Sequence, residues 1–140
     1  MEITVREVMT FGVETISPAA TLEQAAKKMK EHNIGILPVV EDEDLLGVVT
    51  DRDIVLRAVS ERLRPEMTRV RDVMTPEAIC CYEDQSITEV SLLMEKHLVH
   101  RLIVLDRNEK LVGIVSLSDL AAKAHDEKLS GHVLGKISAA

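Results

Sequence analysis

Two segments of the chain repeat apolar positions with the period of an α-helix. In residues 22–29, and again in residues 87–94, apolar or small side chains recur three or four positions apart and so share one helical face. Thr21 and Ser86 stand just before these segments, each followed three residues later by a Gln or Glu. This is the spacing of a capping box, in which both side chains satisfy backbone N–H groups of the first turn. The pattern predicts a helix starting at each position.

Two short apolar runs follow each predicted helix. They are rich in β-branched side chains and are too short for helices, which favours buried strands. A second helix is predicted after each pair of strands, over about 51–60 and about 117–124. The predicted strands cover 36–40, 45–49, 102–105 and 111–115.

The two halves of this pattern carry the same motifs in the same order, which indicates an internal repeat. Val8-Met9-Thr10 recurs as Val73-Met74-Thr75, an offset of 65 residues from Met9 to Met74. Gly47-Val48-Val49-Thr50 recurs as Gly113-Ile114-Val115-Ser116, an offset of 66 residues from Gly47 to Gly113. One residue has therefore entered the polar loop before the second glycine, where an insertion is tolerated.

The size of the repeat sets the expected architecture. A single copy has a marginal core, because a short chain buries little of its surface. We expect an α/β (α+β) fold in which two copies, related by a pseudo-twofold axis, pack sheet to sheet, each with a small three-stranded sheet and two helices. The expected division is repeat one over 5–62, a polar linker over 63–69, repeat two over 70–125 and a C-terminal tail over 126–140.

Composition and charge narrow the classes of function. The formal net charge of the 140 residues is −7, which argues against a nucleic-acid partner because phosphate backbones are held mainly by surplus Lys and Arg. Aromatic residues make up 1% of the chain, so aliphatic side chains must fill the core. No stretch approaches the ~20 apolar residues of a membrane span, and residues 1–10 lack the apolar run of a signal peptide. We expect a cytoplasmic protein with no membrane partner.

Several reactive residue types have simple structural interpretations. Cys80 and Cys81 are adjacent, so they fit neither a disulfide framework nor a zinc-site spacing, and we interpret them as small strand residues. His32 and His97 occupy matching helix C-terminal positions, which suits charge complementation of the helix dipole better than metal binding. No nucleophile, base and orienting group share a recognisable motif. We expect no enzyme activity and no metal site.

A heptad with the pattern Gly-x-x-[Thr/Ser]-x-x-Asp joins the last predicted strand of each copy to the helix that follows. Its acids are Asp53 and Asp119. A helix start presents free N–H groups and the positive end of the helix dipole, which suit a phosphate or a ribose edge. The same spacing is also a capping signature, and the two roles are compatible. Recurrence in both copies, with Arg52 and Ser118 as phosphate-competent donors, favours binding.

Together these motifs resemble a tandem pair of cystathionine β-synthase (CBS) domains, or Bateman module, over roughly residues 5 to 124. The resemblance lies in the Val-Met-Thr opening, in Val13-x-Thr15-Ile16-Ser17-Pro18, in the run from Glu31 to Val40 and in the run from Gly47 to Ile54. Repeat two, with His100-Arg101-Leu102-Ile103-Val104 and the second heptad, is similar to a repeat of the γ subunit of AMP-activated protein kinase.

The resemblance implies a regulatory module that binds an adenine nucleotide, AMP, ADP or ATP, in the cleft between its repeats. It implies no catalytic cofactor, and it requires an unidentified effector protein to receive the signal. The implied contacts are ribose hydrogen bonds from Asp53 and Asp119, hydroxyl donors at Thr50, Ser116 and Ser118, phosphate contacts from His100 and Arg101, and adenine contacts from Thr15 and the backbone beside Ile16.

The resemblance also implies a homodimer. An apolar helix after each heptad, with Ile54, Val55 and Ala58 in repeat one, is the expected interface. Two other functions stay open, namely an adenosine ligand of the S-adenosylmethionine or NAD type, and an interaction protein with vestigial clefts. The copies differ, because Gly35-Ile36 stands where repeat two has His100-Arg101, and we expect the two clefts to be unequal.

Overall fold

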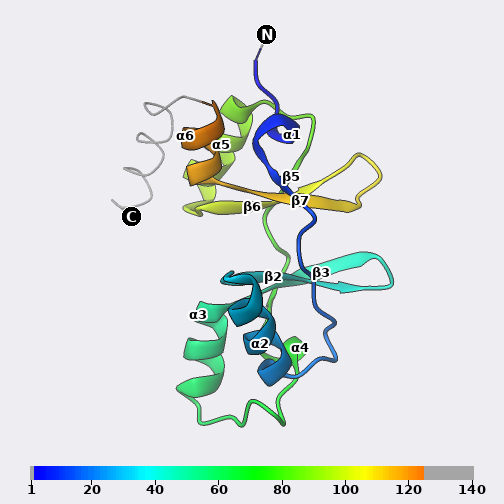
Figure 1. Cartoon of the computed structure of the whole chain (residues 1–140), viewed down its shortest axis with the longest axis vertical. Coiled ribbons are helices and arrows are strands. Elements are labelled where there is room, and N and C mark those ends of the chain that lie inside the picture. The colour runs from blue at the N-terminus through cyan, green and yellow to red at the C-terminus, as the bar shows by residue number, and fades with distance from the viewer. Residues whose placement is uncertain (1, 125–140) are drawn as a thin grey trace. The chain divides into compact units, whose positions relative to one another are not determined.

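The computed structural model describes residues 2–124, so the expected tail over 126–140 lies outside the described residues. Two sheets and their helices make up the described chain, which confirms the predicted mixed α/β class (Figure 1). The chain divides into two compact units. The continuous unit is formed by residues 14–78, and the discontinuous unit by the residues up to Val13 together with those from Ile79 onward.

The continuous unit has a three-stranded antiparallel sheet with strand order β2-β3-β4. Its helices lie on one side of that sheet (Figure 1). The strands are β2 (Ile36–Glu41), β3 (Asp44–Thr50) and β4 (Thr75–Pro76). The helices are α2 (Leu22–His32), α3 (Asp51–Ile54), which continues as the π-helical segment η1 (Val55–Val59), and α4 (Val70–Val73).

The core of the continuous unit forms where its helices meet the sheet. Leu22, Ala25 and Met29 lie on the predicted apolar face of α2 and are buried against strand residues such as Leu37. Ala58 of η1 belongs to the same cluster and is only 2% exposed. The expectation that Ala58 lies at an intermolecular interface is therefore wrong, because this side of the helix packs inward. The remaining buried members are Ile16, Val39, Val49, Val70 and Val73.

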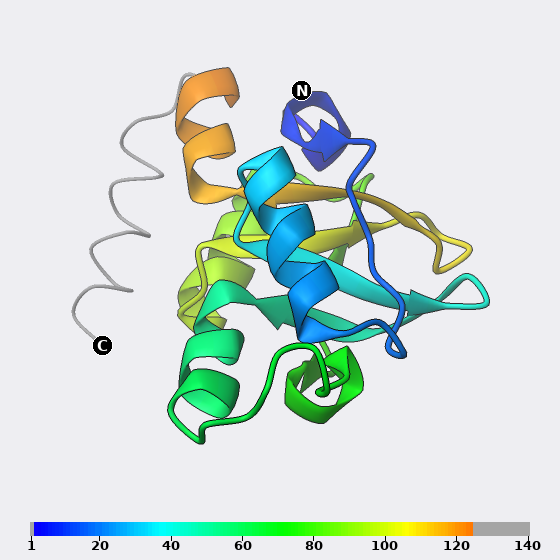
Figure 2. The same cartoon turned by 60° about the horizontal axis from the view of Figure 1, so that its bottom comes forward.

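The discontinuous unit has a four-stranded sheet with strand order β1-β7-β6-β5, and its helices again lie on one side (Figure 1). The strands are β1 (Thr10–Phe11), β5 (Cys80–Tyr82), β6 (Arg101–Leu105) and β7 (Leu111–Ser116), and β6 and β7 form a hairpin (Figure 2). The helices are α1 (Val5–Val8), α5 (Ile87–His97) and α6 (Leu117–Ala124). The buried core comes from these helices and strands, with Val5, Val90, Met94, Leu102, Val115 and Leu120 among its members.

The sheets differ because of one proline. In the discontinuous unit β5 pairs parallel to β6, and Ile103 N–H donates to Ile79 O at 3.2 Å. Pro38 occupies the position of Ile103 in the other copy and has no N–H to donate. The matching segment there forms only a single bridge, between Ile16 and Val39. The expected three strands are thus found in the continuous unit, whereas the discontinuous unit has four.

The predicted capping box is confirmed in full at the start of α2, whereas at the start of α5 only its first bond, to the serine hydroxyl, is present. Gln24 N–H donates to Thr21 Oγ1 at 3.2 Å, and Thr21 N–H donates to Gln24 Oε1 at 2.9 Å. Glu89 N–H donates to Ser86 Oγ at 3.2 Å. These contacts involve residues three positions apart, so the sequence spacing alone determines them.

The opening segment of each sequence repeat packs in the compact unit that the other repeat mainly forms. The first opening, α1 and β1, belongs to the discontinuous unit, where Thr10 pairs with Ile114 of β7. The second opening, α4 and β4, belongs to the continuous unit, where Thr75 pairs with Val48 of β3.

The repeated glycine makes this exchange possible. A Cβ atom on Gly47 would lie 2.3 Å from Thr75 O, and one on Gly113 would lie 2.5 Å from Thr10 O. Both are backbone contacts too close for any larger residue. In each unit, the repeated glycine therefore lies directly against the backbone of the repeated Val-Met-Thr motif.

Candidate functional site

Both heptads form a capped junction between a strand and a helix. In the continuous unit, Asp53 N–H donates to Thr50 Oγ1 and Thr50 N–H donates to Asp53 Oδ2, both at 3.0 Å. In the discontinuous unit, Asp119 N–H donates to Ser116 Oγ at 3.1 Å and Ser116 N–H donates to Asp119 Oδ2 at 2.9 Å. The capping role inferred from the spacing is confirmed in both copies. Each cap uses one carboxylate oxygen.

Asp53 has further partners within its own unit. The side chain is 10% exposed, and Thr75 Oγ1 lies 3.1 Å from Oδ1 and 3.3 Å from Oδ2. Arg57 Nη1 lies 3.8 Å from Oδ1 and donates to the carbonyl oxygens of Val73 and Met74 at 3.0 and 2.9 Å. Asp53 and Arg57 together hold the α4–β4 segment against α3 and η1.

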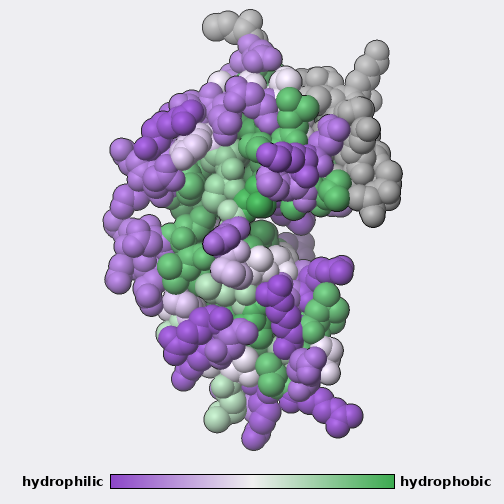
Figure 3. All heavy atoms as spheres, turned by 180° about the vertical axis from the view of Figure 1, so that it is seen from behind, coloured by the Kyte–Doolittle hydropathy of each residue, from purple (hydrophilic) through white to green (hydrophobic). Residues whose placement is uncertain are grey.

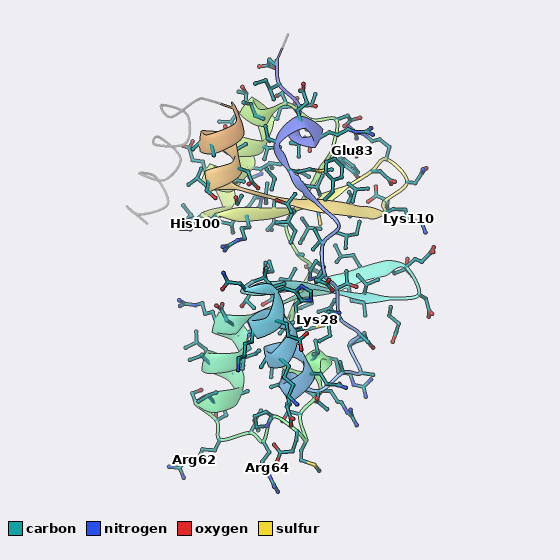
Figure 4. All side chains as sticks on the ribbon, viewed as in Figure 1. Lys28, Arg62, Arg64, Glu83, His100 and Lys110 are labelled. Atoms are coloured by element: carbon teal, nitrogen blue, oxygen red, sulfur yellow. The ribbon has the colours of Figure 1, made fainter. Side chains whose placement is uncertain are left out.

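Four of the expected ligand-contact residues gather at the matching junction of repeat two. Arg101 and Ser116 are opposite each other in the β6–β7 ladder. Ser116 Oγ lies 2.9 Å from Ser118 Oγ, and Leu117 N–H donates to His100 O at 2.8 Å. His100 lies at the start of β6 (Figure 4), and the side chains of His100, Arg101 and Ser118 are exposed. This edge therefore presents a guanidinium group, an imidazole and hydroxyls to solvent beside the start of α6.

The junction of repeat one has different chemistry. Asp51 N–H donates to Gly35 O at 3.0 Å, which matches the bond between Leu117 and His100. A Cβ atom on Gly35 would lie 2.7 Å from Asp51 Oδ2, so a carboxylate lies over the glycine that replaces the histidine. Arg52 is exposed at the same helix start. Repeat one thus presents an acid where repeat two presents a basic side chain.

The structure does not bring the expected adenine contacts next to Thr50. Ile16 N–H donates to Pro38 O at 3.0 Å, and Ile16 O accepts from Val40 N–H at 2.9 Å, so both polar backbone groups of Ile16 bind β2. Thr15 O accepts from Lys28 Nζ at 2.6 Å. Because Thr50 lies on β3, the whole of β2 separates it from this segment.

Two residues of this network were missed in the sequence, namely Thr75 and Arg57. The one signal for Thr75 is that it ends the repeated Val-Met-Thr motif. Arg57 has no such signal, since its partners are backbone carbonyl groups at residues 73 and 74.

The two cysteines show no sign of an activated thiolate. Cys81 is buried, and burial raises its pKa to about 12, while burial and then Glu109 raise the pKa of Cys80. Both stay protonated and weakly nucleophilic at neutral pH. Their interpretation as strand residues is confirmed by their place in β5. Within residues 2–124, no cluster of His, Cys, Asp and Glu could hold a metal ion, and no helix is long and apolar enough to cross a membrane.

Sequence comparison identifies the class of protein. The CBS domain model matches the chain twice, at residues 5–60 and 70–126, and the chain therefore belongs to the CBS domain family. It is 42% identical over 134 residues to the CBS domain-containing protein YhcV of Bacillus subtilis (strain 168), covering 96% of this chain and 94% of that relative.

Two similar solved structures contain adenosine compounds. The CBS domain pair of protein MJ0100, in complex with 5′-methylthioadenosine and S-adenosyl-L-methionine, has a TM-score of 0.76 and 26% identity, covering 86% of this chain and 94% of that one. CBSX2 in complex with AMP has a TM-score of 0.75 and 25% identity, covering 89% of this chain and 98% of that one. Two CBS proteins with a similar fold thus bind adenosine-type ligands.

Proposed function

We propose that the chain is a regulatory module that binds an adenine nucleotide, AMP, ADP or ATP, through its CBS repeats and passes occupancy to a partner protein. The observation that carries this proposal is the basic, hydroxyl-rich junction of Arg101, Ser116, Ser118 and His100 in repeat two. A guanidinium fork can donate two hydrogen bonds to one phosphate group, and a helix start favours an anion. The adenosine ligands of similar CBS pairs support it.

In this proposal Asp119 holds the ribose. An ionised carboxylate has about four acceptor positions, so the cap bond at Oδ2 is compatible with hydrogen bonds from two ribose hydroxyls. Asp53 would have to accommodate a ribose beside its bonds to Thr50 and Thr75. A ligand at repeat one, contacted by Thr15, Ile16, Thr50, Arg52 and Asp53, should therefore bind more weakly.

Calorimetric titration of AMP, ADP and ATP tests these roles. We expect Asp119→Asn to weaken affinity by about tenfold or more, because an ionised acceptor is lost from charge-assisted bonds. Asp53→Asn should have the smaller effect. The exposed hairpin residue Asp44 offers a matched control, and Asp44→Asn should bind like wild type. Clear wild-type binding with unchanged affinity in both heptad variants would remove these acids from the site.

The ligand can also be an adenosine compound without a phosphate chain. Arg101→Ala distinguishes the two ligand classes, because it should weaken the binding of ATP and leave the binding of S-adenosylmethionine almost unaffected. If S-adenosylmethionine binds wild type and the nucleotides do not, the phosphate assignment of Arg101 is wrong.

A protein that only docks partners is the second candidate, and the multiple internal bonds of Asp53 favour it. Thermal-shift measurements with AMP, ADP, ATP, NAD and S-adenosylmethionine separate the two. A ligand at 100 times its Kd adds about 2.7 kcal/mol of stability, which is readily visible. The absence of a shift with all five would favour the docking protein.

A further inference from the structure

The junction between strand and helix in repeat one differs from that of repeat two in a pair of facing residues. Gly35 stands where repeat two has His100, and Asp51 stands where repeat two has Leu117. Both pairs are joined by the same backbone hydrogen bond, from Asp51 N–H to Gly35 O at 3.0 Å and from Leu117 N–H to His100 O at 2.8 Å. The backbone therefore follows the same local path in both copies, and the side chains distinguish them.

The glycine and the acid of repeat one depend on each other. The Cβ atom of any larger residue at position 35 would lie 2.7 Å from Oδ2 and 3.1 Å from Cγ of Asp51. A histidine like that of repeat two therefore cannot occupy position 35 while the Asp51 carboxylate keeps this place. The loss of an imidazole and the gain of a carboxylate are thus a single change in the chemistry of the junction.

The Asp51 carboxylate is accessible to a ligand. Asp51 is exposed, and its Oδ1 accepts from the neighbouring Arg52 N–H at 2.8 Å. The ion pairs among the described residues do not include Asp51. Hydrophilic side chains cover much of the face of the molecule in Figure 3, so exposure alone would be ordinary. What sets Asp51 apart is its place in the heptad, between Thr50 and Asp53.

The strand beside this pair also lacks the cation of repeat two. Ile36 is opposite Thr50 in the β2–β3 ladder, as Arg101 is opposite Ser116 in the β6–β7 ladder. An aliphatic side chain offers no donor to a phosphate. Arg52 remains exposed at the junction, one position after the acid. Repeat one thus combines a guanidinium with a carboxylate, whereas repeat two combines a guanidinium with an imidazole.

We propose that Asp51 makes repeat one select adenosine compounds whose 5′ group is neutral or cationic, whereas repeat two selects nucleotides. The inference rests on the proposed function, because it assigns a ligand class to each repeat of the same module. The 5′ group of an adenosine compound held by Asp53 through its ribose would meet the Asp51 carboxylate. A phosphate is repelled there, and a neutral or cationic group is not.

A purely structural role for Asp51 predicts a different result. An acid in the first turn of a helix interacts favourably with the helix dipole, and Asp51 is in the first turn of α3. Loss of that interaction would affect the binding of every ligand alike. AMP and adenosine differ only in the phosphate, so the ratio of their Kd values separates discrimination by charge from a structural effect.

A heteronuclear NMR titration of the full chain with AMP and with adenosine measures this ratio for each repeat separately. The amide signals of Arg52 and Asp53 report on repeat one, and those of Ser118 and Asp119 report on repeat two. We expect the Kd of AMP to exceed that of adenosine at least about threefold at repeat one, and the reverse order at repeat two. Rising salt should reduce both differences, because it screens the charges.

Substitutions at Asp51 test the cause of the preference. Asp51→Asn keeps the size of the side chain and removes its charge. At repeat one it should lower the ratio of the AMP Kd to the adenosine Kd at least about threefold, and leave the adenosine Kd within about twofold. Asp51→Glu keeps the charge and should keep the ratio within about twofold of wild type. Asp44→Asn makes the same chemical change at an exposed position of the β2–β3 hairpin and should leave the ratio unchanged.

Three results would overturn this inference while leaving the proposed function in place. They are tighter binding of AMP than of adenosine at repeat one, an equal ratio in wild type and Asp51→Asn, and movement of the repeat-two signals alone with both ligands. If neither ligand moved any signal of either repeat, the proposed function itself would be wrong, and the assignment to Asp51 would be wrong with it.

Discussion

Asp53 and Asp119 have the same place in the heptad but different surroundings. Their caps could be predicted, because a hydroxyl and a carboxyl three residues apart need only a local helix start to meet. The contact of Thr75 with Asp53 could not, since it spans 22 residues and depends on the path of the chain between them. Local contacts of the candidate site followed from spacing, and long-range contacts did not.

Tyr82, the only tyrosine of the chain, belongs to a polar cluster at the hairpin of β6 and β7. The Tyr82 hydroxyl donates to a carboxylate oxygen of Glu109, and the Arg107 guanidinium lies 4.2 Å from the ring centroid. Arg107 also forms a two-pronged ion pair with Asp84, with N–O distances of 2.8 and 2.9 Å. The hydrogen bond to Glu109 is the main cause of a raised pKa at Tyr82.

Alkaline titration of the phenolate absorbance should therefore give a midpoint above the ordinary value of 10.0. Only the protonated hydroxyl can donate to Glu109. The stabilisation that this hydrogen bond gives to the fold is thus fully present below the pKa of Tyr82 in the unfolded chain. It is lost as the pH rises through the higher pKa of Tyr82 in the folded protein. Glu109→Gln should lower the midpoint toward 10.0, and no tryptophan obscures the signal. A wild-type midpoint at or below that value would contradict the contact.

Among the elements, the long helices and the two hairpins were predicted within a few residues, because each contains several periods of its own pattern. The four short elements α1, β1, α4 and β4 were not predicted. They have two or four residues each, and they are ordered by partners from the other sequence repeat. A period cannot be recognised in a segment shorter than one or two turns.

The hydroxyl of Thr75 should stabilise the α4–β4 segment. Thr75→Val keeps the shape of the side chain and removes one donor to the buried Asp53 carboxylate, which should cost about 1–3 kcal/mol in the free energy of unfolding. Thr10 is the matched position in the discontinuous unit, and its hydroxyl forms no hydrogen bond with a described residue. Thr10→Val should stay within about 0.5 kcal/mol of wild type in urea denaturation. Equal effects of the two changes would show that the Asp53 contact is not the cause.

The close approach of β3 and β4 predicts a severe effect at one glycine. In Gly47→Ala the new methyl group would meet backbone atoms of Thr75 and Pro76, which should cost about 1–3 kcal/mol in the free energy of unfolding. Gly35→Ala would meet only the movable side chain of Asp51 and should cost less. Urea denaturation of the two variants compares them directly, and a larger loss for Gly35→Ala would contradict this packing.

For the whole molecule, the repeat and the fold class could be predicted from two offsets and one hydrophobic pattern. Which segments of the chain make up each compact unit could not be predicted. Their boundaries follow the exchange of opening segments, which adjacent sequence motifs do not reveal. The sheet-to-sheet packing of the two copies and the linker over 63–69 stay predictions.

Self-association is a prediction at this scale. We expect a homodimer, and the exposed Val55, Leu56 and Val59 of η1, together with Leu92 of α5, are the candidates for its interface. Light scattering at micromolar concentration should give twice the chain mass of 15.5 kDa. Val59→Glu should shift the protein toward monomer, because a charge would replace buried apolar area. A wild-type mass of one chain would contradict the dimer.

The exchange of opening segments bears on the ancestry of the chain. A gene duplication copies a stretch of sequence, and the copied stretch here contains α1 and β1 but not the β4 strand that completes its own sheet. A single ancestral repeat could therefore have formed this fold only as a pair of chains, in which the first residues of each chain complete the sheet of the other. Fusion of two such copies would turn an encounter between molecules, which depends on concentration, into a permanent intramolecular contact.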